Sequence, residues 1–171
     1  MALATKYGAD WISDTGTGLN GELGRIFDNL SESQMASIYI AGDLPFLTES
    51  DIGVLIKTSG YGKSITLCPA AKDEGTNGIL VPPGINYRPL LGNHSFPRHV
   101  QAAEKAGLRF EICNTYGWSM DLDSPEDLIT FSNKDPDFAS RILNSSKDFS
   151  QKIKGMDKDI LREKMEGLNP H

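Results

Sequence analysis

Short apolar runs that end at turn residues alternate along this chain with longer segments whose apolar residues recur at helical spacing. The short runs predict buried strands, and the longer segments predict helices. The predicted strands are residues 10–13, 37–41, 64–68, 78–81 and 109–113. The predicted helices are a segment that follows the glycine-rich turn at residues 15–21 and ends at Leu30, residues 97–105, and the segments that follow Thr48 and Ser124. Because strands and helices alternate, the pattern predicts an α/β fold with a mostly parallel sheet and flanking helices.

Two of the predicted helices have clear N-terminal signals. Thr48 precedes a first turn that contains Glu49 and Asp51, and Ser124 precedes Pro125. Threonine and serine side chains cap helices well, proline fits the first helical position, and acidic residues favour the positive end of the helix dipole. These starts are therefore predicted from specific side chains and not from spacing alone.

The last part of the chain is polar and differs from the rest. Residues 147–166 carry many charges and only weak apolar spacing, which predicts a surface helix or a frayed end and not a second domain. We therefore expect a core at residues 1–132 and a polar helical C-terminal tail at residues 133–171.

Composition excludes several classes of function. The 171 residues carry a net charge of −6, which argues against a nucleic-acid surface. No apolar run approaches the ~18 residues of a membrane span, and residues 1–7 lack the apolar stretch of a signal peptide. Cys68 and Cys113 each follow apolar residues and predict buried free thiols. We expect a cytoplasmic protein with no membrane partner.

Three aspartates follow predicted strands. Asp43 comes directly after residues 37–41, and Asp121 and Asp123 lie on one side of an extended segment. Ligands of α/β sheets bind beyond the carboxyl ends of strands. Carboxylates held close together need a cation between them, and Mg²⁺ prefers carboxylates together with phosphate oxygens. The three residues predict a magnesium site, with helix capping as the alternative role for Asp123.

Two loops offer groups that bind anions. Residues 72–78 supply backbone amides, a hydroxyl and an amide, although an ordinary surface turn is the simpler interpretation. Residues 92–95 precede a helix, where Ser95 could either cap the helix or hold a phosphate or carboxylate. His99 lies one turn further on and is expected to face the same side as Ser95. A structural hydrogen-bonding role is the simplest interpretation of His99.

Five motifs occur together in a characteristic order. They are Gly18-Leu19-Asn20, Gly42-Asp43-Leu44-Pro45-x-Leu47, Gly75-Thr76-Asn77, Gly92-x-x-Ser95-Phe96-x-x-His99 and Asp121-x-Asp123-x-Pro125-Glu126-Asp127-Leu128. Over residues 8–130 the chain resembles the 2-phospho-L-lactate guanylyltransferase family, also described as phosphoenolpyruvate guanylyltransferase. The resemblance implies a nucleotide-diphospho-sugar-transferase-like fold of the GT-A type. It also implies transfer of GMP from GTP to 2-phospho-L-lactate or phosphoenolpyruvate, with release of pyrophosphate, in biosynthesis of the deazaflavin coenzyme F-420.

The resemblance also implies roles for individual residues. The implied catalytic magnesium ligands are Asp43, Asp121 and Asp123, the implied binders of the phosphorylated three-carbon acid are Thr76, Gly92 and Ser95, and the residues implied to lie near guanine and ribose are Gly18, Leu19 and Asn20. The acceptor phosphate is itself an anionic nucleophile, so no side-chain base is required. The chemistry then depends on charge neutralisation and alignment.

Three features depart from the family pattern. Glu74 stands where the family usually has glycine, and its carboxylate is expected to weaken anion binding. His94 replaces another small residue. The family also opens with a strand, a basic nucleotide-binding loop and a second strand that this sequence does not show, so we expect an N-terminally truncated member. With a sheet order of 3-2-1-4, the strand at residues 37–41 would have an exposed edge, which favours a homodimer or aggregation.

Two alternative functions remain open from the sequence. One is a catalytically silent protein that binds the phospho-acid or another protein and has lost the nucleotide. The other is a nucleotidyltransferase with a different acceptor, such as a sugar phosphate or molybdopterin.

Overall fold

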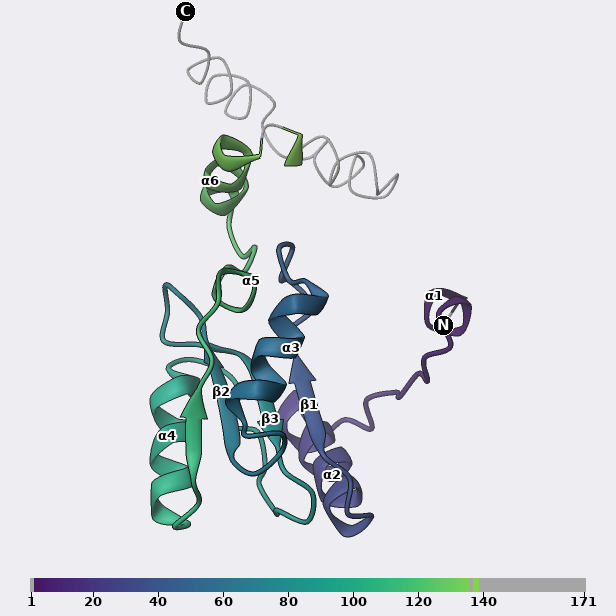
Figure 1. Cartoon of the computed structure of the whole chain (residues 1–171). Helices are drawn as coiled ribbons and strands as arrows, with labels where there is room; N and C mark the ends of the chain where they lie inside the picture. The colour runs from purple at the N-terminus through teal and green to yellow at the C-terminus, as the bar shows by residue number, and fades with distance from the viewer. Residues whose placement is uncertain (1, 136, 139–171) are drawn as a thin grey trace, which may run out of the picture. The chain divides into compact units, whose positions relative to one another are not determined.

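Four strands form one mixed sheet in the order β1-β3-β2-β4 (Figure 1). The strands are β1 (Ser37–Ile40), β2 (Ile65–Pro69), β3 (Thr76–Val81) and β4 (Phe110–Ile112). The computed structural model describes residues 2–135, 137 and 138. The chain divides into two units, Met1–Leu122 and Asp123–His171, and the sheet belongs to the first. Most of the predicted tail at residues 133–171 lies outside the described residues, as does the helix expected at 147–166, so that division stays a prediction.

Helices cover both faces of the sheet. The helices of the first unit are α1 (Ala2–Lys6), α2 (Gly18–Glu32), α3 (Glu49–Thr58), α4 (Ser95–Lys105) and α5 (Tyr116–Ser119), and the second unit contains α6 (Pro125–Lys134). Phe27 of α2 and Ala103 of α4 share one buried cluster with Leu67. Leu55 of α3 and Trp118 of α5 share the other cluster with Cys68 and Leu80. Because successive strand residues point to opposite faces, Leu67 and Cys68 supply the two clusters in turn.

The prediction of a mostly parallel sheet was wrong. β3 runs antiparallel to both β1 and β2, and the one parallel pairing among the described strands joins β2 to β4. The reason is the short connection at residues 70–75. A parallel partner would need a crossover of about a dozen residues or more, whereas a short loop reverses the chain.

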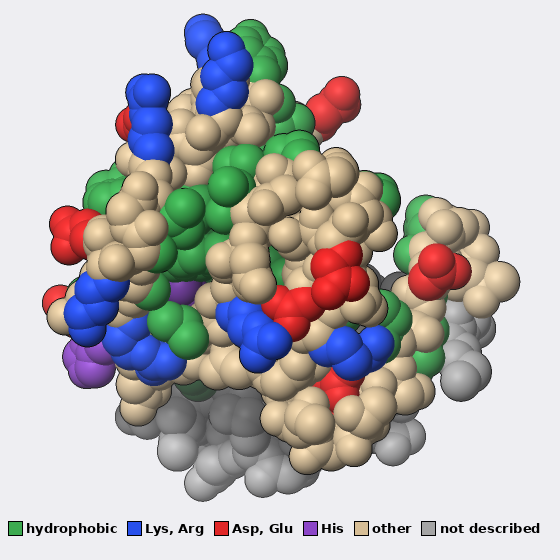
Figure 2. All heavy atoms as spheres, turned by 90° about the horizontal axis from the view of Figure 1, so that it is seen from below, with side chains coloured by type: hydrophobic (Ala, Val, Ile, Leu, Met, Phe, Trp, Pro, Cys, Tyr) green, Lys and Arg blue, Asp and Glu red, His purple; other side chains and the backbone are tan. Residues whose placement is uncertain are grey.

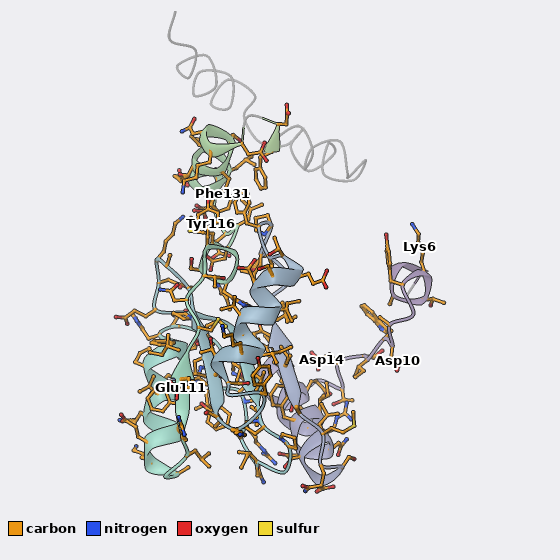
Figure 3. The ribbon with its side chains drawn as sticks, viewed as in Figure 1. Lys6, Asp10, Asp14, Glu111, Tyr116 and Phe131 are labelled. Atoms are coloured by element: carbon orange, nitrogen blue, oxygen red, sulfur yellow. The ribbon has the colours of Figure 1, made fainter. Side chains whose placement is uncertain are left out.

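The predicted strand at residues 10–13 was also wrong. The segment between α1 and α2, on which Figure 3 labels Asp10 and Asp14, is irregular. Trp11 and Ile12 are 61% and 53% exposed. An apolar, extended sequence becomes a strand only where a neighbouring backbone can pair with it, and no described strand does so here.

Both predicted helix starts are confirmed. The hydroxyl of Thr48 accepts a hydrogen bond from the Asp51 amide, and the Asp51 carboxylate accepts one from the Thr48 amide. Ser124 and Asp127 form the same reciprocal pair at the start of α6. Each pair satisfies amides that the helix itself leaves without partners.

Both cysteines lie in the core, and charged side chains of both signs lie on the surface. Cys68 and Cys113 are buried free thiols, as predicted. No helix in the described part of the chain is long and apolar enough to cross a membrane. The face seen from below in Figure 2 carries basic and acidic side chains close to one another, and the ion pairs of the described residues include Arg88–Asp28 and Arg109–Glu111.

Candidate functional site

The end of β1 and the start of β3 lie side by side because the two strands are antiparallel. The Ala41 amide donates to the Asn77 carbonyl at 2.9 Å. Asp43 follows Ala41 by two residues, and Thr76 is the first residue of β3. The predicted acidic site and the predicted anion-binding loop therefore meet at one end of the sheet, which the arrowhead of β1 marks in Figure 1.

A backbone hydrogen bond brings two of the predicted metal ligands into the same neighbourhood. The Leu122 amide donates to the Asp43 carbonyl at 2.9 Å. Asp121, the preceding residue, is buried, whereas Asp43 is exposed. A second bond, from the Asn77 side-chain amide to the Trp118 carbonyl at 3.0 Å, fixes the same segment to β3. The chain therefore holds Asp43 and Asp121 on backbone that is anchored to the sheet.

The third predicted ligand, Asp123, begins the second unit. Its backbone amide donates to the Asp127 carboxylate at 3.2 Å, next to the Ser124 cap of α6. Within the ranges that the structure describes, no three His, Cys, Asp or Glu residues form a group that could hold a metal ion. The magnesium site of three aspartates therefore stays a prediction.

Three buried polar side chains form a cluster at the start of β3 and α4. His99 Nδ1 lies 3.0 Å from Thr76 Oγ1, and Ser95 Oγ lies 3.1 Å from the same oxygen. The exposed fractions of Thr76, Ser95 and His99 are 6%, 2% and 0%. His99 does face the same side as Ser95, as the helical spacing predicted. We call these three residues the hydroxyl cluster.

The chemical state of His99 follows from its surroundings. The Leu90 amide donates to His99 Nε2 at 2.7 Å. Burial lowers the pKa of His99 to about 4, and the positive charge of Arg98 acts in the same direction. The ring is therefore neutral at pH 7. Because Nε2 accepts a hydrogen bond, the single ring hydrogen is on Nδ1 and points to Thr76 Oγ1.

Ser95 does not cap α4. His94 occupies the N-cap position with left-handed backbone angles, φ 51° and ψ 41°, and Ser95 is the first helical residue. The Ser95 hydroxyl forms a hydrogen bond with Thr76 Oγ1 instead. Gly92 precedes this turn with φ +115°, a conformation that side-chain-bearing residues rarely adopt.

Asn20 has a role that the sequence did not reveal. Its Nδ2 donates to the Leu91 carbonyl at 2.9 Å, and its Oδ1 accepts from the Leu91 amide at 2.8 Å. Leu91 adjoins Gly92, so the segment predicted to lie near the nucleotide is fixed directly to the loop predicted to bind the acceptor. Gly18 has φ +72° and Leu19 is 59% exposed.

Glu74 and His94 contact each other across the two predicted anion-binding loops. His94 Nδ1 lies 2.7 Å from Glu74 Oε2, and both residues have positive φ, 51° and 57°. They line a cavity of about 390 Å³ together with Lys72, Asp73 and Asn93. The two departures from the family pattern are thus partners of one another.

Comparison with known proteins identifies the family. The family model described as "Guanylyl transferase CofC like" matches residues 2–162. The chain belongs to this family. The resemblance expected from the order of the motifs is therefore confirmed.

Curated relatives carry the two names that the motifs suggested. The 2-phospho-L-lactate guanylyltransferase of Methanopyrus kandleri is 36% identical over 90 residues, which are 53% of this chain and 46% of that protein. The phosphoenolpyruvate guanylyltransferase of Rubrobacter xylanophilus is 35% identical over 127 residues, or 73% of this chain and 62% of that protein. The chain therefore spans less than two thirds of the length of these relatives.

Proposed function

We propose that this protein is a guanylyltransferase that transfers GMP from GTP to the phosphate of 2-phospho-L-lactate or phosphoenolpyruvate and releases pyrophosphate. The reaction would serve biosynthesis of the deazaflavin coenzyme F-420. The observation that carries the proposal is the meeting of the hydroxyl cluster and the Asp43–Leu122 hydrogen bond at one end of the sheet. Hydrogen-bond donors for an anionic acceptor then adjoin carboxylates for a cation. Family membership and the names of the relatives support the same reaction, and with it a GT-A type of fold.

The acceptor would bind at Thr76, Gly92 and Ser95. The hydroxyl pair of Thr76 and Ser95 keeps one hydrogen that can be donated to a phosphate or carboxylate, and Gly92 lets an anion approach the backbone closely. Asn20 and His99 hold the intervening backbone at Leu91 and Leu90, so the acceptor loop is fixed before the ligand arrives. A prearranged loop lowers the entropic cost of alignment.

Magnesium would be held by Asp43 and Asp121 of the first unit, and the family resemblance adds Asp123 to the set. Carboxylate oxygens are the ligands that Mg²⁺ prefers, so the donor set fits the ion. Bound magnesium would neutralise the charge of the phosphates during transfer. The protein contributes the placement of Asp43 and Asp121 through backbone bonds to the sheet.

The nucleotide would lie near Gly18, Leu19 and Asn20, at the first turn of α2. An oxygen of the acceptor phosphate attacks the α-phosphorus of GTP, and the bond from that phosphorus to the bridging oxygen breaks. Pyrophosphate leaves with the bonding electron pair, and the acceptor phosphate needs no proton removed. The residues named here therefore bind, orient and neutralise, which is the main requirement of such transfers.

A pyrophosphate-release assay tests the proposal. The chain is incubated with GTP, Mg²⁺ and, in separate reactions, phosphoenolpyruvate, 2-phospho-L-lactate, 3-phosphoglycerate and a sugar phosphate. We expect turnover with a phosphorylated three-carbon acid, a loss of about a hundredfold or more in Asp43→Asn, and unchanged turnover in Glu104→Gln on the exposed side of α4.

Other outcomes would favour the alternatives. Binding of phosphoenolpyruvate by calorimetry without GTP binding or turnover would indicate a silent binding protein. Turnover with the sugar phosphate alone would indicate another acceptor. Neither binding nor turnover with any of these compounds would overturn the assignment.

A further inference from the structure

We propose that His99 is a positioning residue that makes the hydroxyl pair of Thr76 and Ser95 a hydrogen-bond donor toward the anionic acceptor. This inference rests on the proposed function for the identity of the ligand. It adds a residue that touches neither acceptor nor nucleotide and a reason why the site selects an anion. The number of hydrogens in the hydroxyl cluster leads to this role.

The count begins at the imidazole ring. Leu90 donates its amide hydrogen to Nε2 at 2.7 Å, so Nε2 of the neutral ring carries no hydrogen. Nδ1 therefore carries it and donates to Thr76 Oγ1 over 3.0 Å. One acceptor position of the Thr76 hydroxyl is thus occupied by a donor that cannot also accept.

Two hydroxyl hydrogens then remain, one on Thr76 and one on Ser95. The 3.1 Å bond between the two oxygens uses one of them, whichever residue donates in it. The other hydrogen is left over in either arrangement, and neither hydroxyl has a further hydrogen bond within the described part of the chain. The cluster therefore presents a hydrogen-bond donor, and a negatively charged oxygen is the acceptor that such a donor binds most strongly.

Two hydrogen bonds hold the imidazole in this arrangement: the Leu90 amide donates to Nε2, and Nδ1 donates to Thr76 Oγ1. The Tyr87 hydroxyl donates to the backbone carbonyl of His99 at 3.0 Å and so fixes the backbone that carries the ring. The Tyr87 and His99 rings lie 6.2 Å apart between centroids. Rotation of the ring would break the bonds to both nitrogens, so the direction of the Thr76 hydroxyl is fixed by packing.

The same ring links both walls of the acceptor site. Its Nδ1 sets the hydroxyl of Thr76 on β3, and its Nε2 holds Leu90 in the loop that leads to Gly92. A change at His99 should therefore weaken acceptor binding and leave binding of GTP unchanged. A residue needed only for packing would not produce this selective effect.

Two substitutions separate the roles of the two ring nitrogens. In His99→Asn the side-chain NH₂ lies close to the position of Nδ1 and can still donate to Thr76. In His99→Gln the side-chain carbonyl can reach the position of Nε2 and accept from Leu90, but the donor to Thr76 is lost. Calorimetry at pH 7 with phosphoenolpyruvate would compare both with the unmodified chain and with Ser95→Ala, and GTP titrations would provide the reference.

We expect His99→Gln to weaken phosphoenolpyruvate binding about tenfold or more and His99→Asn to weaken it less than about threefold. Equal weakening in the two variants, or unchanged binding in His99→Gln, would overturn the proposal. If circular dichroism shows that a variant is unfolded, the ¹⁵N NMR signals of the imidazole in the unmodified chain test the proposal instead, because they show which ring nitrogen carries the hydrogen. A hydrogen on Nδ1 whose signal shifts in Thr76→Val supports the proposal, and a hydrogen on Nε2 overturns it.

Failure of the proposed function can be distinguished from failure of the role proposed for His99. If the unmodified chain binds neither phosphoenolpyruvate nor 2-phospho-L-lactate while the hydrogen is on Nδ1, the proposed acceptor is wrong and the donor assignment stands. If the acceptor binds and the hydrogen is on Nε2, the role of His99 is wrong and the proposed function stands.

Discussion

The amide of Leu122 donates to the carbonyl of Asp43 across 2.9 Å. This bond joins the turn after β1 to the segment that carries Asp121, 78 positions later in the chain. It brings two aspartates from distant parts of the sequence to the end of the sheet where β3 begins. The same end carries the hydroxyl cluster, so the proposed cation site and the proposed acceptor site adjoin one another.

Replacing Asp121 with asparagine is expected to raise the magnesium concentration needed for half-maximal turnover. Asparagine keeps the shape of the side chain and removes the charge that attracts the ion. We expect at least a tenfold rise, measured by pyrophosphate release across a magnesium titration. The matched control is Asp73→Asn, an exposed residue whose side-chain oxygen can still accept from the Gly75 amide. An identical magnesium dependence in both variants would contradict the predicted role.

Replacing Glu74 with glycine is expected to strengthen phosphoenolpyruvate binding. Glycine adopts the positive φ of 57° at this position without strain, and the substitution removes a negative charge from the acceptor loops. We expect affinity to rise about threefold to tenfold by calorimetry at low ionic strength. Glu74→Gln should also raise the affinity for phosphoenolpyruvate, because it removes only the negative charge. Weaker binding in both variants would show that Glu74 supports the loop.

Replacing Asn20 with alanine is expected to loosen the acceptor loop. The variant loses both hydrogen bonds to the Leu91 backbone, which is about 1–3 kcal/mol of unfolding free energy. Urea denaturation would measure this loss. Asn29→Ala, at an exposed position of α2, is the control and should change the stability little. Equal stabilities of the two variants would indicate that the Asn20 bonds do not form in solution.

The stability of the unmodified chain is expected to fall below pH 6.5 because of His99. The folded state lowers the pKa of His99 from the ordinary 6.5 to about 4 by burial, so the unfolded state binds the proton first as the pH decreases. The contribution of neutral His99 to the free energy of unfolding is fully present above pH 6.5 and is lost progressively between pH 6.5 and 4. Below pH 4 it changes no further. At pH 5 the expected loss relative to pH 7 is about 2 kcal/mol.

The comparison for this pH dependence is His99→Asn, which cannot titrate. Urea denaturation of both proteins at pH 7 and pH 5 isolates the contribution of His99 from those of other groups. The difference in stability between the two proteins should shrink as the pH falls. A difference that is independent of pH would mean that His99 titrates normally in the folded chain.

Features that depend on residues close together in the sequence could be predicted from the sequence. The caps of α3 and α6 depend on residues within four positions of Thr48 and Ser124, and both were predicted correctly. The shared direction of Ser95 and His99 follows from helical spacing alone, and the structure confirms it. These signals need no knowledge of the rest of the fold.

Strand direction and contacts between distant segments could not be predicted in this way. The antiparallel direction of β3 depends on how residues 70–75 turn, and the same residues look like an ordinary loop in either topology. The pairing of Asn20 with Leu91 joins positions 71 residues apart and leaves no local pattern. Residues 10–13 have strand-like composition but no described partner strand, and periodicity cannot show whether such a partner exists.

The central claim is that this chain joins GMP to a phosphorylated three-carbon acid. The most direct measurement is ³¹P NMR of a reaction that contains the chain, GTP, Mg²⁺ and phosphoenolpyruvate or 2-phospho-L-lactate. We expect a new pair of coupled diphosphate signals from the guanylylated acid, together with pyrophosphate, and neither in a sample without the chain. Absence of the diphosphate product with both acceptors, in a sample that is folded by circular dichroism, would contradict it.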